Sequence, residues 1–295
     1  MIDEKSIVKN TYDLIYKKDV DYSLNIFLCG ADTNKTKSIR NLLNIEFQKD
    51  AKFNTVFPEF VFASLFKKKK NNLFELEDDL AKNVDVIVLP LEGPGTLCEL
   101  GAFTMNEELL PKIIAINDRK YDKKKSFINL GPVDLIRKQN SKNYILFEKG
   151  KEELILDEVI DRVRNQRYEK KSTYNLDNFF NLSRFILYLI ALFQPITIGK
   201  LKSLLSLVET DKVKSKHIET ALQILIQKNR IISEYKIDHE LDFYFLSRAG
   251  HIYFYEELIE KLNIKKNFSL IRGEVINSIY KKKKKNMSRD KSLLV

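Results

Sequence analysis

The sequence has few of the residues that mark exported, metal-binding or membrane-spanning proteins. It has two cysteines, Cys29 and Cys98, no tryptophan, and three histidines without metal-ligand spacing. Two cysteines cannot form a disulfide framework, and neither lies in a CxxC or Cys/His pattern. The longest apolar run, Phe185 to Phe193, is too short for a bilayer core of roughly 30 Å, and the first 22 residues lack the apolar stretch of an export signal. We therefore expect a cytoplasmic protein without a metal or a membrane span.

The excess positive charge is concentrated at one end of the chain. The formal net charge is +10. Residues 1–150 carry 24 basic and 22 acidic side chains, residues 151–280 carry 20 and 18, and residues 281–295 carry 7 and 1. The final run KKKKKNMSRDK therefore predicts a basic flexible tail over 281–295. Such a tail could approach phosphates non-specifically or simply keep the chain in solution.

The pattern of apolar residues predicts two domains. In the first half, short β-rich runs alternate with helical stretches, and the run VDVIVLPL at 84–91 is nearly all apolar, as a strand covered on both faces is. We predict an α/β domain over 1–150 with a doubly wound parallel sheet, either Rossmann-like or flavodoxin-like. A helical linker over 151–172 and a mostly helical domain over 173–280 follow. The order of helices and one hairpin in that second domain is typical of a winged helix-turn-helix.

Polar residues and glycines cluster where the predicted strands end, which is where such sheets bind ligands. Gly30 and Asp32 follow the first strand, Glu59 follows the second, and the loop from Glu92 to Thr96 follows the third. Glycines at positions 93 and 95 would let backbone amides approach a ligand closely. The helix expected to begin near Thr96 offers free N–H groups and a partial positive charge. This combination suits a phosphate or a ribose.

Glu99 is the predicted catalytic residue, because it lies one turn inside that helix. A carboxylate there could stabilise or attack the anomeric carbon of a ribose whose C–N bond is breaking. A structural alternative exists, since Thr96 and Glu99 have the spacing of a capping box, in which Glu99 only returns a hydrogen bond to the helix start. Asp32 and Glu59 could likewise cap helices, and Asn129 in SFINLGP could be a turn residue.

These motifs resemble three known families. The block GPGTLCELG after an apolar strand resembles the nucleoside 2-deoxyribosyltransferases and, more loosely, the phosphoribohydrolases with a PGGxGTxxE loop; both use the matching glutamate on glycosidic bonds. Blocks between residues 24 and 142, among them IFLCGAD, FPE, VDVIVLPLEGPGTLCELGAF and KSFINLGPVDLIRKQNSK, resemble retron anti-phage effectors that carry a deoxyribosyltransferase-like domain. Thr96 and Cys98 replace other small residues of that family's loop, which leaves the substrate preference in doubt.

The retron resemblance implies a function and a set of site residues. Glu99 would be catalytic, and NAD would be hydrolysed as a substrate, with no cofactor. A reverse transcriptase and its branched RNA–DNA product (msDNA) would restrain the protein, and homo-oligomers are frequent among the resembled enzymes. The residues that would line the substrate pocket are Gly30, Asp32, Glu59, Glu92, Gly95, Thr96 and Asn129.

Two other functions stay open. The same carboxylate could transfer deoxyribose between bases, because only the exclusion of water separates transfer from hydrolysis. The chain could also be a nucleotide-sensing DNA-binding regulator, as its winged-helix pattern and lysine tail suggest. The expected recognition helix at 215–230 is not strongly basic, which weighs against the regulator.

Overall fold

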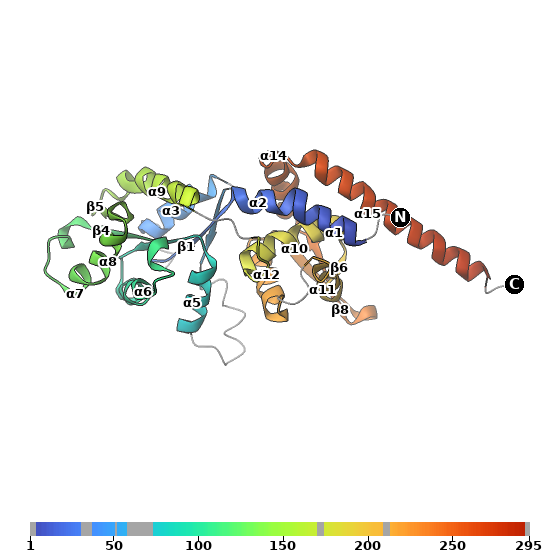
Figure 1. The fold of residues 1–295 in the computed structure, drawn as a ribbon, viewed down its shortest axis with the longest axis horizontal. Helices are drawn as coiled ribbons and strands as arrows, with labels where there is room; N and C mark the ends of the chain where they lie inside the picture. The colour runs from blue at the N-terminus through green and yellow to red at the C-terminus, as the bar shows by residue number, and fades with distance from the viewer. Residues whose placement is uncertain are drawn as a thin grey trace. The chain divides into compact units, whose positions relative to one another are not determined.

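The computed structural model describes residues 4–30, 37–50, 52–57, 73–169, 174–208 and 213–292. The chain divides into two compact units. One, the sheet unit, is Ser23–Ser172; the other, the helical unit, joins Met1–Tyr22 to Thr173–Val295. Each is described by itself below, with labels as in Figure 1.

The sheet unit is built on five parallel strands in the order β2-β1-β3-β4-β5. This order, with helices on both faces, confirms the predicted doubly wound α/β fold. Every residue of β1, β3 and β4 is buried, which explains why these runs are almost continuously apolar. The strands are β1 (Leu24–Leu28), β2 (Phe53–Val56), β3 (Val86–Pro90), β4 (Ile113–Asp118) and β5 (Tyr144–Phe147).

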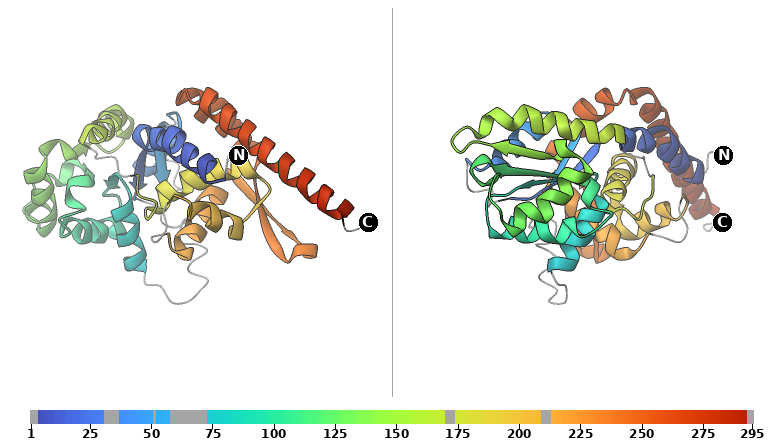
Figure 2. Two further views of the ribbon diagram at one scale, coloured as in Figure 1. Left: turned by 45° about the vertical axis from the view of Figure 1, so that its right-hand side comes forward. Right: turned by 60° about the vertical axis from the view of Figure 1, so that its left-hand side comes forward.

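Helices cover both faces of this sheet (Figures 1 and 2). On one face, Leu43 and Phe47 of α3 and Val159 of α9 pack with alternate residues of the central strands. On the other face lie α5, α6 and α8, and the ring of Phe103 on α6 contacts that of Phe27 on β1, with 5.9 Å between centroids. The helices are α3 (Ile39–Gln48), α5 (Leu73–Asn83), α6 (Pro94–Thr104), α7 (Phe127–Leu130), α8 (Pro132–Gln139) and α9 (Leu156–Glu169); the 3-10 turns are η2 (Leu110–Lys112), η3 (Arg119–Tyr121), η4 (Ser141–Asn143) and η5 (Glu152–Ile155).

The helical unit is organised around α10 (Phe179–Phe193), which is buried along nearly its whole length. No helix in the described ranges is both long and apolar enough to span a membrane. A small antiparallel sheet in the order β6-β8-β7 completes the unit. Its other elements are α1 (Glu4–Thr11), η1 (Tyr12–Tyr16), α2 (Lys17–Tyr22), β6 (Ile196–Thr197), α11 (Ile198–Leu205), α12 (Ser215–Gln227), β7 (Ile231–Lys236), η6 (Ile237–His239), β8 (Leu241–Leu246), α13 (Arg248–Ile252), η7 (Tyr253–Leu258), α14 (Ile259–Lys261) and α15 (Lys265–Ser292).

The division into units differs from the predicted boundaries at 150 and 172. Residues 1–22 pack with the helical unit, because Ile7, Ile15 and Val20 are buried in the same core as α10. Arg184 also donates a hydrogen bond to Asp19 at 2.9 Å, within a buried ion pair. Residues 151–172, expected as a linker, stay with the sheet unit because α9 covers one sheet face.

The structure gives a helix over most of the range 281–295, where the sequence predicted a flexible tail. Residues 281–292 continue α15 as a helix, and residues 293–295 lie outside the described residues. Lysine is a good helix former. Adding residues to an existing helix also avoids the cost of a new nucleus.

Candidate active site

The loop from β3 to α6 places the predicted catalytic residue. α6 begins at Pro94 with Gly93 as its N-cap, slightly before the predicted start. The Gly93 N–H donates to Thr96 Oγ1 at 3.3 Å, and the Thr96 hydroxyl donates to the Gly93 carbonyl at 2.8 Å. Proline is favoured at the first helical position, which explains the early start. Because Thr96 occupies the third helical position and pairs with Gly93, the alternative capping box between Thr96 and Glu99 does not form.

Glu99 instead lies on the face of α6 that packs against β1. It is one turn before Phe103, so the two side chains share a helix face. Phe103 meets Phe27, and Cys29 follows Phe27 on the same side of the strand. The Glu99 carboxylate lies close enough to the Cys29 thiol for its charge, and a hydrogen bond to it, to raise the pKa of that thiol. Two elements far apart in sequence thus converge on one carboxylate.

The Cys29 thiol stays protonated beside Glu99. Burial, then the negative charge of Glu99 and the hydrogen bond to it, raise the pKa of this thiol well above its ordinary value. Only 2% of Cys29 is exposed. A protonated thiol donates, so Cys29 acts as a donor to the carboxylate. Sequence reasoning missed this role, since a lone buried cysteine usually packs as a small apolar residue.

Glu92 joins the same loop to the start of α3. Its Oε1 accepts a hydrogen bond from the Ile39 N–H at 2.9 Å, in the first turn of that helix. A carboxylate is favoured there by the partial positive charge of the helix end. Its Oε2 is also buried, and no residue in the described ranges forms a hydrogen bond with it. One oxygen of Glu92 therefore has a structural role, and the other is available to a ligand.

Gly30 is required by the backbone and by its neighbour Arg40. Its φ of +134° is a conformation that side chains rarely adopt, and a Cβ there would lie 2.8 Å from Arg40 Cβ. Arg40 is 4% exposed and donates from Nε to the Leu28 carbonyl at 3.1 Å. It also donates to the Gly30 carbonyl at 3.4 Å. A buried cation therefore lies against the end of β1.

Arg40 was not identified from the sequence, although one signal was present. Cations are disfavoured in the first turn of a helix because the helix end is itself positive. An arginine at the second position of α3 is therefore unusual. The positive charge of Arg40 lowers the pKa of the Cys29 thiol, whereas the negative charge of Glu99 raises it. The three groups therefore lie near one another.

The glycine loop itself is open. A Cβ added at Gly93 or at Gly95 would meet no described atom within 4 Å. The backbone at the N-terminus of α6 is therefore approachable, as a phosphate or ribose site requires.

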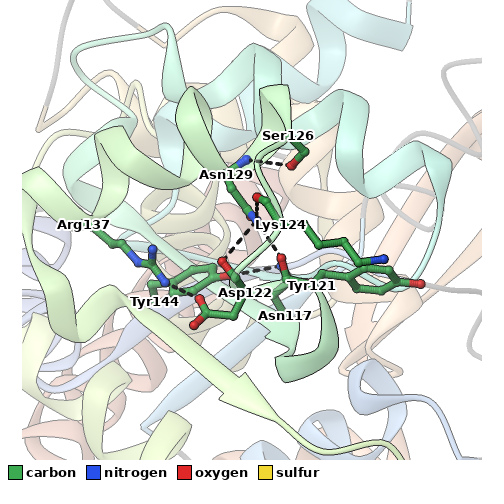
Figure 3. Close-up of polar contacts among 8 residues, drawn as sticks. All are labelled: Asn117, Tyr121, Asp122, Lys124, Ser126, Asn129, Arg137 and Tyr144. Atoms are coloured by element: carbon green, nitrogen blue, oxygen red, sulfur yellow. Dashed lines mark hydrogen bonds and ion pairs between the residues drawn. The ribbon is translucent and has the colours of Figure 1, made fainter.

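Asn129 lies apart from these groups and holds a loop closed. Its Nδ2 approaches the carbonyl oxygens of Tyr121, Asp122 and Lys124 at 2.6, 3.2 and 2.7 Å, as Figure 3 shows. Its backbone N–H donates to Ser126 Oγ at 3.3 Å. The amide nitrogen thus has the turn role that was the alternative to substrate binding.

Two other predicted pocket residues, Asp32 and Glu59, lie outside the described residues. Within the part of the chain that the structure describes, no group of three His, Cys, Asp or Glu side chains could hold a metal ion.

The position of these groups in the fold is that of a ligand site. β1 and β3 are neighbours, yet β1 leads to β2 on one side of the sheet and β3 leads to β4 on the other. Ligands of doubly wound sheets bind outside the carboxyl ends of the strands at such a switch point. Cys29 and Glu92 follow these two strand ends, and Glu99 reaches the first of them. The arrangement presents a half-buried carboxylate beside an open helix N-terminus.

Comparison with known proteins shows the family to which this chain belongs. The profile described as STM3845 retron effector protein matches residues 36–233. A retron Ec86 protein of Escherichia coli is 31% identical over 277 residues, covering 89% of this chain and 87% of its own. A retron Ec73 protein of the same species is 28% identical over 279 residues, covering 82% and 88%. The names of both relatives propose a ribosyltransferase and DNA-binding role. With more than half of its length matched, and with a carboxylate at the switch point of its sheet, the chain belongs to the retron effector family.

Proposed function

We propose that this retron effector acts in anti-phage defence by hydrolysing the bond between nicotinamide and ribose in NAD, with Glu99 as the catalytic carboxylate. The observation that carries the proposal is the position of Glu99. Its side chain is not used to cap α6 and meets the end of β1 instead. A ribosyltransferase role in the names of the relatives supports glycosidic chemistry.

The proposed reaction needs only a carboxylate and water. The bond between the ribose C1′ and the pyridinium nitrogen breaks, and its electron pair goes to that nitrogen, so nicotinamide leaves as a neutral molecule. Glu99 stabilises the positive charge that develops on the sugar or attacks C1′ to form an ester. Water then supplies the hydroxyl group to C1′, ADP-ribose is released, and one proton is lost to solvent. No metal or redox cofactor takes part.

Other parts of the loop would hold the substrate. The amides around Gly95, at the open start of α6, suit a phosphate or ribose hydroxyl. The second oxygen of Glu92 suits a ribose hydroxyl, because it accepts hydrogen bonds and is within the same loop. Asp32 and Glu59 remain proposed pocket residues on the basis of the resemblance alone.

Partners belong to the same proposal. A reverse transcriptase and its msDNA would restrain the enzyme in the cytoplasm until infection releases it. We assign residues 173–280 to a winged helix that docks this complex, and the exposed Lys281 and Lys284 on α15 would approach its phosphates. Self-association through either unit is also proposed, by analogy with the resembled enzymes.

Product analysis tests the chemistry. The purified chain is incubated with NAD labelled in the nicotinamide ring and, separately, with a deoxynucleoside and a second free base. Hydrolysis predicts equal amounts of nicotinamide and ADP-ribose and an unchanged deoxynucleoside. Exchange of bases with intact NAD would replace the proposal by deoxyribosyl transfer. If neither substrate changes while duplex DNA is bound in a sequence-specific way, the regulator is the better account.

A further inference from the structure

The hairpin of β7 and β8 carries a charge opposite to that of the whole chain. Residues 231–246, named here the acidic hairpin, contain four carboxylates and one lysine, a net charge of −3 in a chain of +10. The carboxylates belong to Glu234, Asp238, Glu240 and Asp242. All four residues are exposed. The hairpin projects from the body of its unit as a pair of long strands, drawn in orange (Figure 2).

One face of the acidic hairpin is apolar and exposed. The other face joins the core of the helical unit through Ile231 and Leu246, which are 1% and 4% exposed. On the outward face, Ile232 pairs with Phe245 and Lys236 pairs with Leu241. Ile232 is 43% exposed and Leu241 is 47% exposed. Two half-buried phenylalanines at 243 and 245 lie between them, so the apolar residues form one strip along the hairpin. The ammonium group of Lys236 lies 5.1 Å from the centre of the Phe243 ring in this strip.

A contiguous apolar strip on an edge hairpin usually marks a surface that another molecule covers. At the tip of the hairpin, Ile237 is also apolar and 81% exposed, which supports the inference of a covered surface. Single exposed apolar residues are ordinary, but an apolar strip with a mostly acidic border is the arrangement of a protein interface, with an apolar centre and a polar rim.

The charge decides the kind of partner. Four carboxylates repel a phosphate backbone, and an apolar strip gains nothing from phosphates, so nucleic acid does not fit this surface. A protein whose own apolar patch is ringed by lysine and arginine fits both features. We propose that the acidic hairpin docks a basic protein partner through its apolar strip.

The test uses the reverse transcriptase of the same retron as the probe, so it rests on the proposed function for this choice. Binding of the full-length effector is measured by surface plasmon resonance. The apolar variant is Ile232→Ser with Leu241→Ser, and its control is Leu270→Ser with Ile276→Ser, two residues of α15 that are 61% and 58% exposed. The charge variant is Glu234→Lys with Asp238→Lys. Its control is Glu256→Lys, an exposed acid outside the hairpin.

The apolar variant is expected to bind about tenfold more weakly through faster dissociation. The charge variant is expected to associate about tenfold more slowly at low salt, with the difference shrinking as salt rises. The two controls should bind as the wild type does, and circular dichroism should show all variants folded.

Three results would overturn the proposal. Hairpin variants that bind like the wild type, or a wild type that does not bind, exclude this docking surface. Loss of binding to protein-free msDNA in the hairpin variants would make it a nucleic-acid surface. Altered self-association in sedimentation, with unchanged reverse transcriptase binding, would make it a contact between copies of the chain. NAD hydrolysis is measured on the same samples, so failure of the proposed enzyme activity is seen separately.

Discussion

At the scale of single residues, the approach of the Glu99 carboxylate to the Cys29 thiol is the contact on which the catalytic proposal depends. The sequence predicted that Glu99 faces the strand ends, because its place after a glycine loop and a strand is a local pattern. It could not predict Cys29 as its partner, since that contact depends on how α6 packs on β1. The sequence also could not predict which residue caps α6. Thr96 lies three residues after Gly93, and Glu99 lies three residues after Thr96, so either pair has the spacing of a capping box.

Removing the Cys29 donor is expected to slow catalysis. Cys29→Ala should lower kcat about tenfold with little change in KM, because one hydrogen bond to a charged group is lost in the site. Cys29→Ser should keep most of the activity, since a hydroxyl also donates. Steady-state kinetics with NAD measures both, and the exposed Cys98→Ala is the control. Equal losses in the Ala and Ser variants would mean that the thiol only fills space.

The two glycines near the site should respond differently to alanine. Gly30→Ala forces a side chain into a positive-φ conformation and against Arg40, so we expect the free energy of unfolding of the sheet unit to fall by about 2 kcal/mol. Gly95→Ala meets no described atom within 4 Å and should leave stability within about 0.5 kcal/mol.

Urea unfolding measures the free energy of unfolding of both glycine variants, and steady-state kinetics measures their KM for NAD. Gly95→Ala should raise KM if backbone amides of that loop contact the substrate. A stable Gly30→Ala protein would contradict the strained conformation, and an unchanged KM in Gly95→Ala would remove this loop from the substrate site.

At the scale of elements, α10 carries a buried polar cluster inside an otherwise apolar core. Arg184 and Tyr188 both donate to Asp19 of α2, at 2.9 and 3.0 Å. Lys228, after α12, lies near the same cluster. Its burial, and then the charges of Arg184 and Arg230, lower its pKa to about 7. Removing one partner of a buried ion pair is strongly destabilising, so this cluster holds the first helices to α10.

Lys228 should make the helical unit pH-dependent. Its pKa in the folded state is below the ordinary value of 10.5, so the unfolded chain binds more protons between about pH 7 and the ordinary value. The free energy of unfolding should therefore rise with pH over that interval. Below about pH 7 the folded protein also carries the charged Lys228, so its destabilising effect is then at its full size. Lys228→Gln should flatten this slope and stabilise the unit at the acidic end.

Hydrogen exchange of peptides from the helical unit, measured in urea from about pH 6 to about pH 9, follows this slope. The exposed Lys216→Gln on α12 is the matched control. A slope that is unchanged in Lys228→Gln would show that the amine is charged and solvated in the folded protein.

At the scale of the whole molecule, local patterns predicted the elements better than they predicted the units. The parallel sheet and the strand at 84–91 were predicted because apolar runs and turn residues define such strands locally. The sequence did not predict that residues 1–22 belong to the helical unit. Their contacts with α10 join parts of the chain that are separated by all residues of the sheet unit. The lysine run at 281–285 was expected to be flexible, since charge alone does not reveal that a preceding helix extends through it.

The division into units predicts separate effects of two neighbouring substitutions. Ile15 is fully buried in the core of the helical unit, and Leu14 is 46% exposed. Ile15→Ala should destabilise the helical unit by about 2–5 kcal/mol and leave hydrogen exchange in the sheet unit unchanged. Leu14→Ala should change neither unit by more than about 0.5 kcal/mol. Faster exchange in β1 or β3 of Ile15→Ala would contradict the assignment of residues 1–22.

The most direct measurement of the account is nicotinamide release from NAD by the purified chain and by Glu99→Gln, with the exposed Glu107→Gln as control. The wild type and the control should release nicotinamide, and Glu99→Gln should lose activity by about a thousandfold or more while keeping its fold, because the charge that stabilises the sugar is gone. Unchanged release by Glu99→Gln, or no release by the wild type, would contradict the catalytic role assigned to this carboxylate.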